Sequence, residues 1–200
     1  MSERVGEHLR DEDWYAEDLG GAVFRDCTFT DVDLSECTTV GAMFEECTFH
    51  NCRFNASTHT SSAFVACDFR RTSFFGATFD GCKLIGSVFS ECTLRPLTVR
   101  GGQWGGVTIR STNLSKLDLT GVDLSESDVS MSDLTDSVLR DCNLSGANVR
   151  ETELGGADLR GATLDRVDLA AARLRRTQLD LQGAVLLAEL HGAQVDAGVL

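Results

Sequence analysis

Large apolar residues recur at every fifth position along most of this chain. Between residues 19 and 179, 26 of the 33 residues whose numbers end in 4 or 9 are Leu or Phe. The exceptions are Thr39, His59, Val99, Trp104, Ile109, Val129 and Val149. A second register, at numbers ending in 2 or 7, holds mostly small residues and includes all eight cysteines. A period of five fits neither a helix nor a long strand, so the chain is predicted to turn at every repeat.

Glycine indicates how many repeats complete one coil. In the column of residues 21, 41, 61 and so on to 161, six of the eight residues are Gly, whereas the column that begins at residue 31 has none. Glycine supplies the positive φ that some tight turns require. The 20-residue spacing therefore predicts coils of four repeats, each stacked on its neighbours.

The repeats also resemble those of a known family. The segments Gly156–Leu159 (GADL) and Gly161–Leu164 (GATL) resemble the A(D/N)LxG motif of the pentapeptide-repeat proteins. This resemblance covers residues 17 to 181 and implies an all-β fold, a right-handed quadrilateral β-helix. The segments Ala42–Phe44 (AMF) and Leu94–Thr98 (LRPLT) resemble the branch of mycobacterial fluoroquinolone-resistance proteins, the MfpA branch, and the Qnr branch is more distant.

The limits of the register divide the chain into three segments. Residues 1–16 are predicted to form an N-terminal cap segment, residues 17–180 the β-helix, and residues 181–200 a short C-terminal α-helix and tail. Asp180 can cap this helix, and His191 with Gly192 can end it. Between them, Leu181–Leu190 is apolar nearly all round.

The apolar helix has two interpretations. It can fold back on the last coil and cover an edge that would otherwise pair with other strands. It can also meet a second surface, and the family resemblance favours a twofold homodimer joined end to end through the helix and the tail. The residues expected at that interface are Leu181, Ala184, Val185, Leu187, Ala188, Leu190 and Val195.

Candidate chemistry is sparse. There is no C-x-x-C pair, the four histidines are scattered, and no glycine-rich phosphate loop opens a helix. We therefore expect no enzyme activity, no cofactor and no metal. The first 16 residues carry charges and no apolar signal segment, so we expect a cytoplasmic protein with reduced core cysteines and no membrane association. Thr39 and His59 indicate either a buried polar pair or a locally widened turn.

Charge is arranged in bands along the chain. The net charge is -13, to which residues 11–50 contribute -10, residues 51–115 +4 and residues 116–158 -7. An acidic rod could occupy a cationic groove that normally holds DNA, without binding nucleic acid itself. The acids expected to face the partner, all predicted to point outward, are Asp118, Asp123, Asp128, Asp133, Asp136, Glu151, Glu153 and Asp158.

The family resemblance implies which enzyme provides this groove. It implies DNA gyrase, and by extension topoisomerase IV, with the protein acting as a DNA mimic that modulates the enzyme and protects it from fluoroquinolones. Two alternatives stay open. The protein could confer self-immunity against a natural gyrase poison, or it could be a structural scaffold with an unrelated partner, because acidic surfaces are common in soluble proteins.

Overall fold

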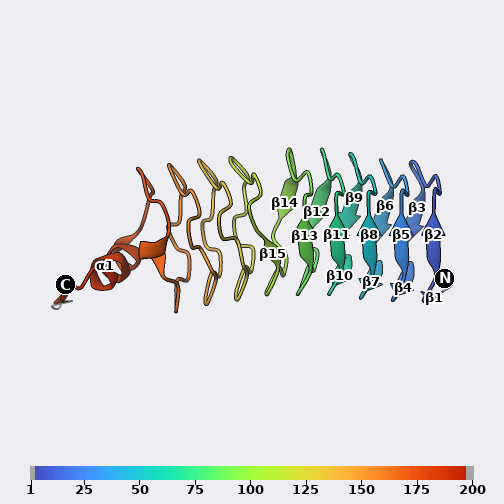
Figure 1. Cartoon of the computed structure of the whole chain (residues 1–200). Coiled ribbons are helices and arrows are strands. Elements are labelled where there is room, and N and C mark those ends of the chain that lie inside the picture. Colours follow the sequence, from blue (N-terminus) through green and yellow to red (C-terminus); the bar gives the residue numbers. More distant parts are fainter. Residues whose placement is uncertain (1–2, 197–200) are drawn as a thin grey trace.

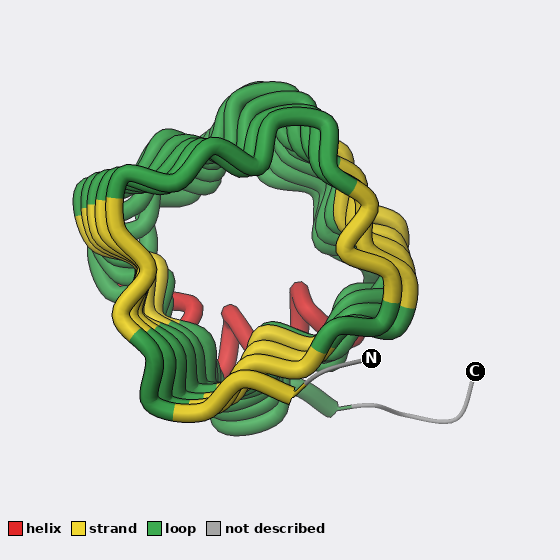
Figure 2. The backbone as a smooth tube through the Cα atoms, turned by 90° about the vertical axis from the view of Figure 1, so that its right-hand side faces the viewer, coloured by secondary structure: helices red, strands yellow, loops and turns green. Residues whose placement is uncertain are grey.

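The chain winds into a four-sided rod of stacked coils. The computed structural model describes residues 3–196. Every strand pair is parallel, and the paired residues lie 20 positions apart, with one irregularity between Asp18 and Gly20. Figure 1 shows the coils stacked from the N-terminus to the helix at the other end, and Figure 2 shows the four-sided outline along the axis. The predicted all-β quadrilateral β-helix is confirmed.

Three of the four sides carry sheets, and we number the sides in chain order. Side I contains β1 (Glu3–Val5), β4 (Val23–Arg25), β7 (Met43–Glu45) and β10 (Ala63–Val65). Side II contains β2 (His8–Arg10), β5 (Thr28–Thr30), β8 (Thr48–His50), β11 (Asp68–Arg70), β13 (Val88–Ser90) and β15 (Thr108–Ile109). Side IV contains β3 (Asp18–Gly20), β6 (Thr38–Val40), β9 (Thr58–Thr60), β12 (Thr78–Asp80) and β14 (Thr98–Arg100). Side III is joined by isolated bridges such as Asp33↔Arg53.

Both predicted inward registers are buried. Aromatic rings stack from coil to coil, as Phe44 does on Phe64 with ring centroids 4.7 Å apart. Burial of such side chains provides about 1.5–3 kcal/mol each and is the main force that holds the coils together. All eight cysteines are free thiols, and seven of them are buried, with Cys92 half-buried. The expected role of cysteine as a small core residue is therefore confirmed.

The N-terminal boundary of the β-helix was predicted wrongly. Strands β1 and β2 pair with β4 and β5, so residues 3–16 are already part of the β-helix and not a separate cap segment. Leu9 and Trp14 continue the inward register, and Arg4 occupies the same register at the open end. Its guanidinium lies over the Trp14 and Phe24 rings, 5.7 and 5.9 Å from their centroids. A cation on aromatic faces can thus close the end where an apolar residue would be exposed.

Two kinds of corner divide the rod. From residue 114 to 164, the carbonyl of each inward residue accepts a hydrogen bond from the amide three positions later, as in Leu124 to Ser127 at 3.2 Å. Between residues 24 and 80, this bond occurs only on side III, for example at Leu34. The other corners there are more open and are flanked by three-residue strands, which leave room for Phe. Residues 110–168 form no strand, only bridges and closed turns.

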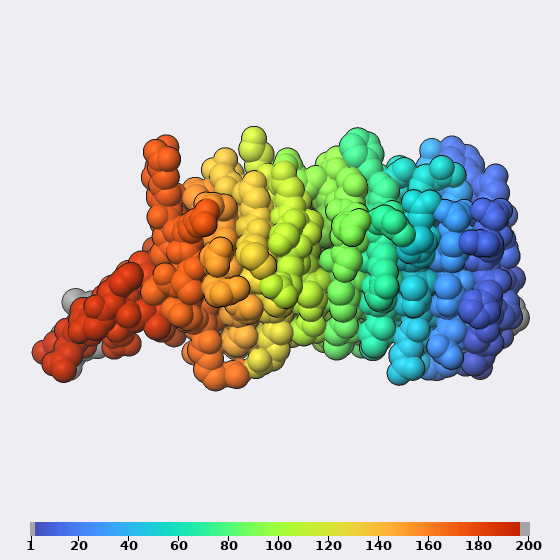
Figure 3. Space-filling view, in the orientation of Figure 1, coloured from blue at the N-terminus to red at the C-terminus, as the bar shows by residue number. Residues whose placement is uncertain are grey.

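The C-terminal helix ends the rod as the sequence predicted. Helix α1 (Leu181–Leu190) is capped by Asp180, whose carboxylate accepts a hydrogen bond from the Gly183 amide at 2.9 Å, and it ends at His191. It packs on the 3-10 turn η1 (Leu169–Ala171) and projects beyond the stacked coils, as Figure 3 shows. No helix among the described residues is long and apolar enough to span a membrane.

Candidate partner-binding surface

Six of the eight candidate acids occupy the second position of their repeats, where a carboxylate oxygen can stabilise the backbone, and Asp136 and Glu151 lie at corners. Oδ1 of Asp118, Asp123 and Asp133 accepts a hydrogen bond from the amide two residues later, at 3.0, 3.1 and 2.9 Å. Asp128 makes the same contact at 3.0 Å. Such local bonds are why Asp is favoured at turns. The Oδ2 atoms of Asp118, Asp123 and Asp133 are left for solvent or a partner.

A five-residue spacing places these acids on different sides of the rod. Bridges align Asp123 with Asn143 on side I, Asp128 with Asn148 on side II, Asp133 with Glu153 on side III, and Asp118 with Val138 on side IV. The residues from 116 to 158 therefore form an acidic ring around two coils. A ring of charge resembles a section of duplex DNA more than a flat acidic patch does.

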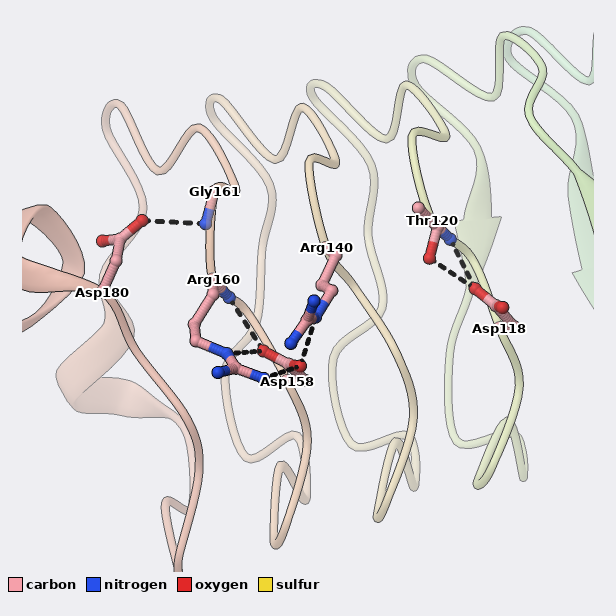
Figure 4. A network of polar contacts seen from close by, with 7 residues as sticks. All are labelled: Asp118, Thr120, Arg140, Asp158, Arg160, Gly161 and Asp180. Carbon is pink, nitrogen blue, oxygen red and sulfur yellow. Dashed lines mark hydrogen bonds and ion pairs between the residues drawn. The ribbon is translucent and has the colours of Figure 1, made fainter.

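Asp158 was predicted to point outward, and the structure contradicts this. Only 12 % of its side chain is exposed, and it accepts hydrogen bonds from Arg140 at 2.5 Å and Arg160 at 2.7 Å (Figure 4). The hydrogen bonds from Arg160, aided by those from Arg140, hold its pKa well below the ordinary value against the opposing effect of burial. Asp158 is a structural carboxylate that joins neighbouring coils, and it is removed from the candidate surface.

Ion pairs divide the remaining candidates into two groups. Glu153 is paired with Arg173 at 2.6 Å, and Asp128 lies 3.6 Å from Arg110. Partial burial would raise the pKa of Asp128, but hydrogen bonds from Ser130 and the charge of Arg110 lower it overall. Within residues 3–196, five candidates have no ion-pair partner, and these form the unpaired set: Asp118, Asp123, Asp133, Asp136 and Glu151.

The sequence prediction missed one member of this group. Asp141 is exposed at the corner between sides IV and I, and it too has no ion pair among the described residues. Asp136 and Asp141 extend over Gly156 and Gly161 of the next coil, where an added Cβ would overlap their carboxylate oxygens. An acid at a corner with Gly 20 residues later is thus the sequence signal that could have found it.

Thr39 and His59 form a closed polar network inside the rod. Thr39 Oγ1 lies 2.8 Å from His59 Nδ1, and Ser57 Oγ lies 3.0 Å from His59 Nε2. The Ser57 hydroxyl donates to the Phe54 carbonyl at 2.7 Å, so it accepts from Nε2–H. Complete burial lowers the pKa of His59 to about 3, and in the resulting neutral ring Nδ1 accepts from Thr39. Of the two predictions, the buried polar pair is confirmed.

The expected interface residues on α1 and in the segment after it differ in exposure. Leu181, Leu190 and Val195 are exposed by 69, 39 and 38 %, and Ala184 is also exposed. Val185, Leu187 and Ala188 are half-buried, and Leu187 packs on the last coil. The helix therefore caps the rod and still presents apolar side chains to solvent. The tail residues 197–200 lie outside the described residues.

No group of three or more potential metal ligands occurs within residues 3–196.

These features define a β-solenoid scaffold protein, in which regular coils carry an outer surface of charged and polar residues. The chain belongs to the pentapeptide-repeat family. A family model described as a pentapeptide repeat region matches residues 72–149, and one described as pentapeptide repeats (8 copies) matches residues 22–58 and 142–180. A search of curated proteins finds no match.

Solved structures of similar fold include QnrB1, described as a plasmid-mediated fluoroquinolone resistance protein. Full-length QnrB1 is 19 % identical, with a TM-score of 0.61, and the match covers 96 % of this chain and 100 % of QnrB1. A trypsin-treated variant of QnrB1 is 21 % identical, with a TM-score of 0.55, and the match covers 96 % and 97 % of the two chains. Identity at this level supports a shared fold.

Proposed function

We propose that this protein is a DNA mimic that binds DNA gyrase, modulates its activity and protects it from fluoroquinolones. The observation that carries the proposal is the ring of unpaired carboxylates around residues 118–151. We extend the proposal to topoisomerase IV, because the same kind of cationic DNA-binding groove would accept this acidic rod. Both enzymes work on chromosomal DNA, so the proposal also places the protein in the cytoplasm.

The density of charge supports mimicry of duplex DNA. Residues 116–158 carry a net charge of -7 over about two coils. At a rise of about 4.8 Å per coil, this is roughly one charge per 1.4 Å, and duplex DNA carries one per about 1.7 Å. Because the acids surround the rod, a cationic groove could hold it in several rotational settings and still meet carboxylates.

The decisive experiment compares two variants of equal charge. One replaces Asp118, Asp123, Asp133 and Asp136 with Asn, which keeps the Oδ1 acceptors and removes four unpaired charges. The matched control replaces Asp33, Asp68, Asp80 and Glu91 with Asn or Gln in the N-terminal half. We expect the first variant to bind gyrase about tenfold more weakly, with a shallower salt dependence, and the control to bind like wild type.

Surface plasmon resonance on gyrase, and supercoiling assays with and without a fluoroquinolone, measure these outcomes. Equal losses from both variants would contradict the assignment of the surface to residues 118–151. A wild-type protein that does not bind gyrase at all would contradict the function and favour a scaffold with another partner. Protection against a natural gyrase poison, but not against a fluoroquinolone, would favour self-immunity.

We further propose that two copies join end to end through α1. The exposed Leu181 and Leu190 would then be covered by the partner's equivalent residues, since a twofold interface is self-complementary. Replacing both with Glu places like charges across the interface without disturbing the half-buried face of the helix. Light scattering should report a dimer for wild type and a monomer for the variant, and a monomeric wild type would refute the dimer.

A further inference from the structure

The backbone ladder that joins successive coils is interrupted once along two sides of the rod. On sides III and IV, residues 91–101 make no coil-to-coil backbone hydrogen bond with residues 110–120, although both segments lie within the described residues. Six amides therefore lack the partner that their position in the coil predicts: Glu91, Leu94, Val99, Gly101, Asn113 and Asp118. We call this interruption the seam.

The ladder is intact on both sides of the seam. One coil earlier, the Phe74 amide donates to Thr93 at 2.8 Å, and one coil later the Leu114 amide donates to Asp133 at 2.8 Å. Around the same coil, side I is also intact, where the Asp123 amide donates to Gly102 at 3.0 Å. Because the equivalent amides of the neighbouring coils are paired, six losses between the same two coils mark a local separation of these coils.

Side-chain volume explains the separation. The column of small positions between sides III and IV contains Cys37, Ser57, Ala77, Ser137 and Ala157. In the two coils that meet at the seam, this column instead holds Leu97 and Leu117, which are both buried. A leucine in each of two successive coils needs more room than the small residues found elsewhere in this column, which accounts for the larger separation of the coils here.

The seam is accessible to water. A surface groove of about 560 Å³ lies between Phe89–Cys92 on one side of it and Thr108–Asn113 on the other. Across sides III and IV, the direct polar link is made by Arg95, whose guanidinium donates to Asn113 Oδ1 at 3.2 Å and to Ser115 Oγ at 2.7 Å. Side-chain bonds of this kind tolerate movement that a backbone ladder does not.

We infer that the seam is a hinge, which lets the rod bend between its N-terminal and C-terminal halves about the intact sides I and II. The two acidic regions, residues 11–50 and 116–158, lie on opposite sides of it. Bending at the seam changes the angle between these regions while each half stays rigid, as expected for a hinge at a site of low local stability. The inference rests on the backbone geometry and does not depend on the proposed partner.

Amide hydrogen exchange measured by NMR tests the hinge directly. In wild type, the six unpaired amides should exchange at least about tenfold faster than the paired amides of Phe74, Leu114 and Val138. Replacing Leu97 and Leu117 with Ala restores the usual small column and should slow exchange at the six amides. Replacing Arg95 with Ala removes the side-chain link and should speed it, with no change at Phe74.

Spin-label distances test the bending itself, in a Cys92→Ser background. Labels at Thr58→Cys and Gln178→Cys span the seam, whereas the control pair Asp18→Cys and Thr78→Cys lies within the N-terminal half and outside the seam. A hinge predicts a broader distance distribution for the spanning pair, broader still with Arg95→Ala. Equal widths for the two pairs, or slow exchange at the six amides of wild type, would overturn the inference, even if the double Ala variant does not fold.

Discussion

The two halves of the rod solve the same packing problem in different ways. Residues 3–109 surround stacked Phe rings with short strands and mostly open corners, whereas residues 110–180 surround Leu with closed turns. The difference is visible in the interior. An apolar channel of about 20 Å³ is lined by residues from Phe79 to Leu159, and thus lies mainly in the Leu half. The stacked rings from Phe24 to Phe74 do not line this space, whereas the Leu side chains of the C-terminal half leave a narrow apolar gap.

Both halves carry ion-paired and unpaired acids. In the N-terminal half, Asp33 pairs with Arg53 at 2.8 Å and Asp68 with Arg70 at 2.5 Å, whereas most acids of residues 11–50 have no ion pair within residues 3–196. In the C-terminal half, Asp118, Asp123, Asp133, Asp136 and Asp141 likewise have no such partner among the described residues. The proposed function depends on these C-terminal acids because they surround two successive coils.

Truncating a buried core side chain should give the largest difference in unfolding free energy between the two halves. Phe64→Ala removes a fully buried ring stacked on Phe44, and we expect it to cost about 3–5 kcal/mol. Leu139→Ala removes a side chain that already borders the channel and so makes fewer contacts, and we expect a cost of about 2 kcal/mol. Urea unfolding measures both, and equal costs would show that the channel does not weaken packing.

The next largest effect should come from the structural carboxylate of the C-terminal half. Asp158→Asn keeps one acceptor but loses the charge-assisted bonds to Arg140 and Arg160, and it should cost about 1.5–3 kcal/mol. Asp118→Asn, at an exposed position, should change stability by less than about 0.5 kcal/mol. Thermal melts of the two variants at equal pH test this distinction, which fails if both behave alike.

A pH-dependent loss of stability should be specific to the N-terminal half. His59 is neutral when folded, with a pKa of about 3, and unfolding raises this to its ordinary value of 6.5. The unfolded chain therefore binds one more proton between these values, so stability is full above pH 6.5 and falls as the pH decreases. Between about pH 6.5 and pH 5 the loss should be about 2 kcal/mol.

The variant His59→Phe continues the ring stack on Phe79 and should remove this contribution. Unfolding free energies of the two proteins at about pH 7 and pH 5 isolate it from the titration of carboxylates. A wild-type protein that loses no more stability than the variant would contradict the neutral buried ring.

The smallest expected effect concerns the thiols, seven of which belong to the N-terminal half. Burial raises the pKa of Cys37 to about 12 and that of Cys92 to about 11, so these two thiols stay protonated at about pH 8. The native protein should react very slowly with a disulfide reagent, with half-buried Cys92 first, and the unfolded protein should show all eight thiols. Reductant should leave the melting temperature unchanged. Rapid reaction of several native thiols would indicate that the Phe half opens.

The five-residue register alone was enough to predict the coil, the inward residues and the burial of the cysteines. It could do so because each repeat contacts only its neighbours 20 residues away, so sequence spacing and spatial neighbours coincide. The helix limits were also predictable, because Asp180 and Gly192 act on adjacent residues. The boundary at residue 17 was wrong, since Arg4 can close the rod through a cation–aromatic contact that an apolar pattern does not reveal.

Only the tertiary structure determines the contacts that side chains make with other coils and with corners. Asp158 and Asp133 occupy equivalent repeat positions, yet Arg140 and Arg160 converge on the first, and no base among the described residues reaches the second. The seam likewise depends on Leu97 meeting Leu117 across a coil boundary, and neither residue breaks the pattern strongly by itself. Repeat position fixes whether a side chain points inward or outward. The partner of an outward charge depends on long, flexible side chains from neighbouring coils, and only the folded arrangement of these determines which acids stay unpaired.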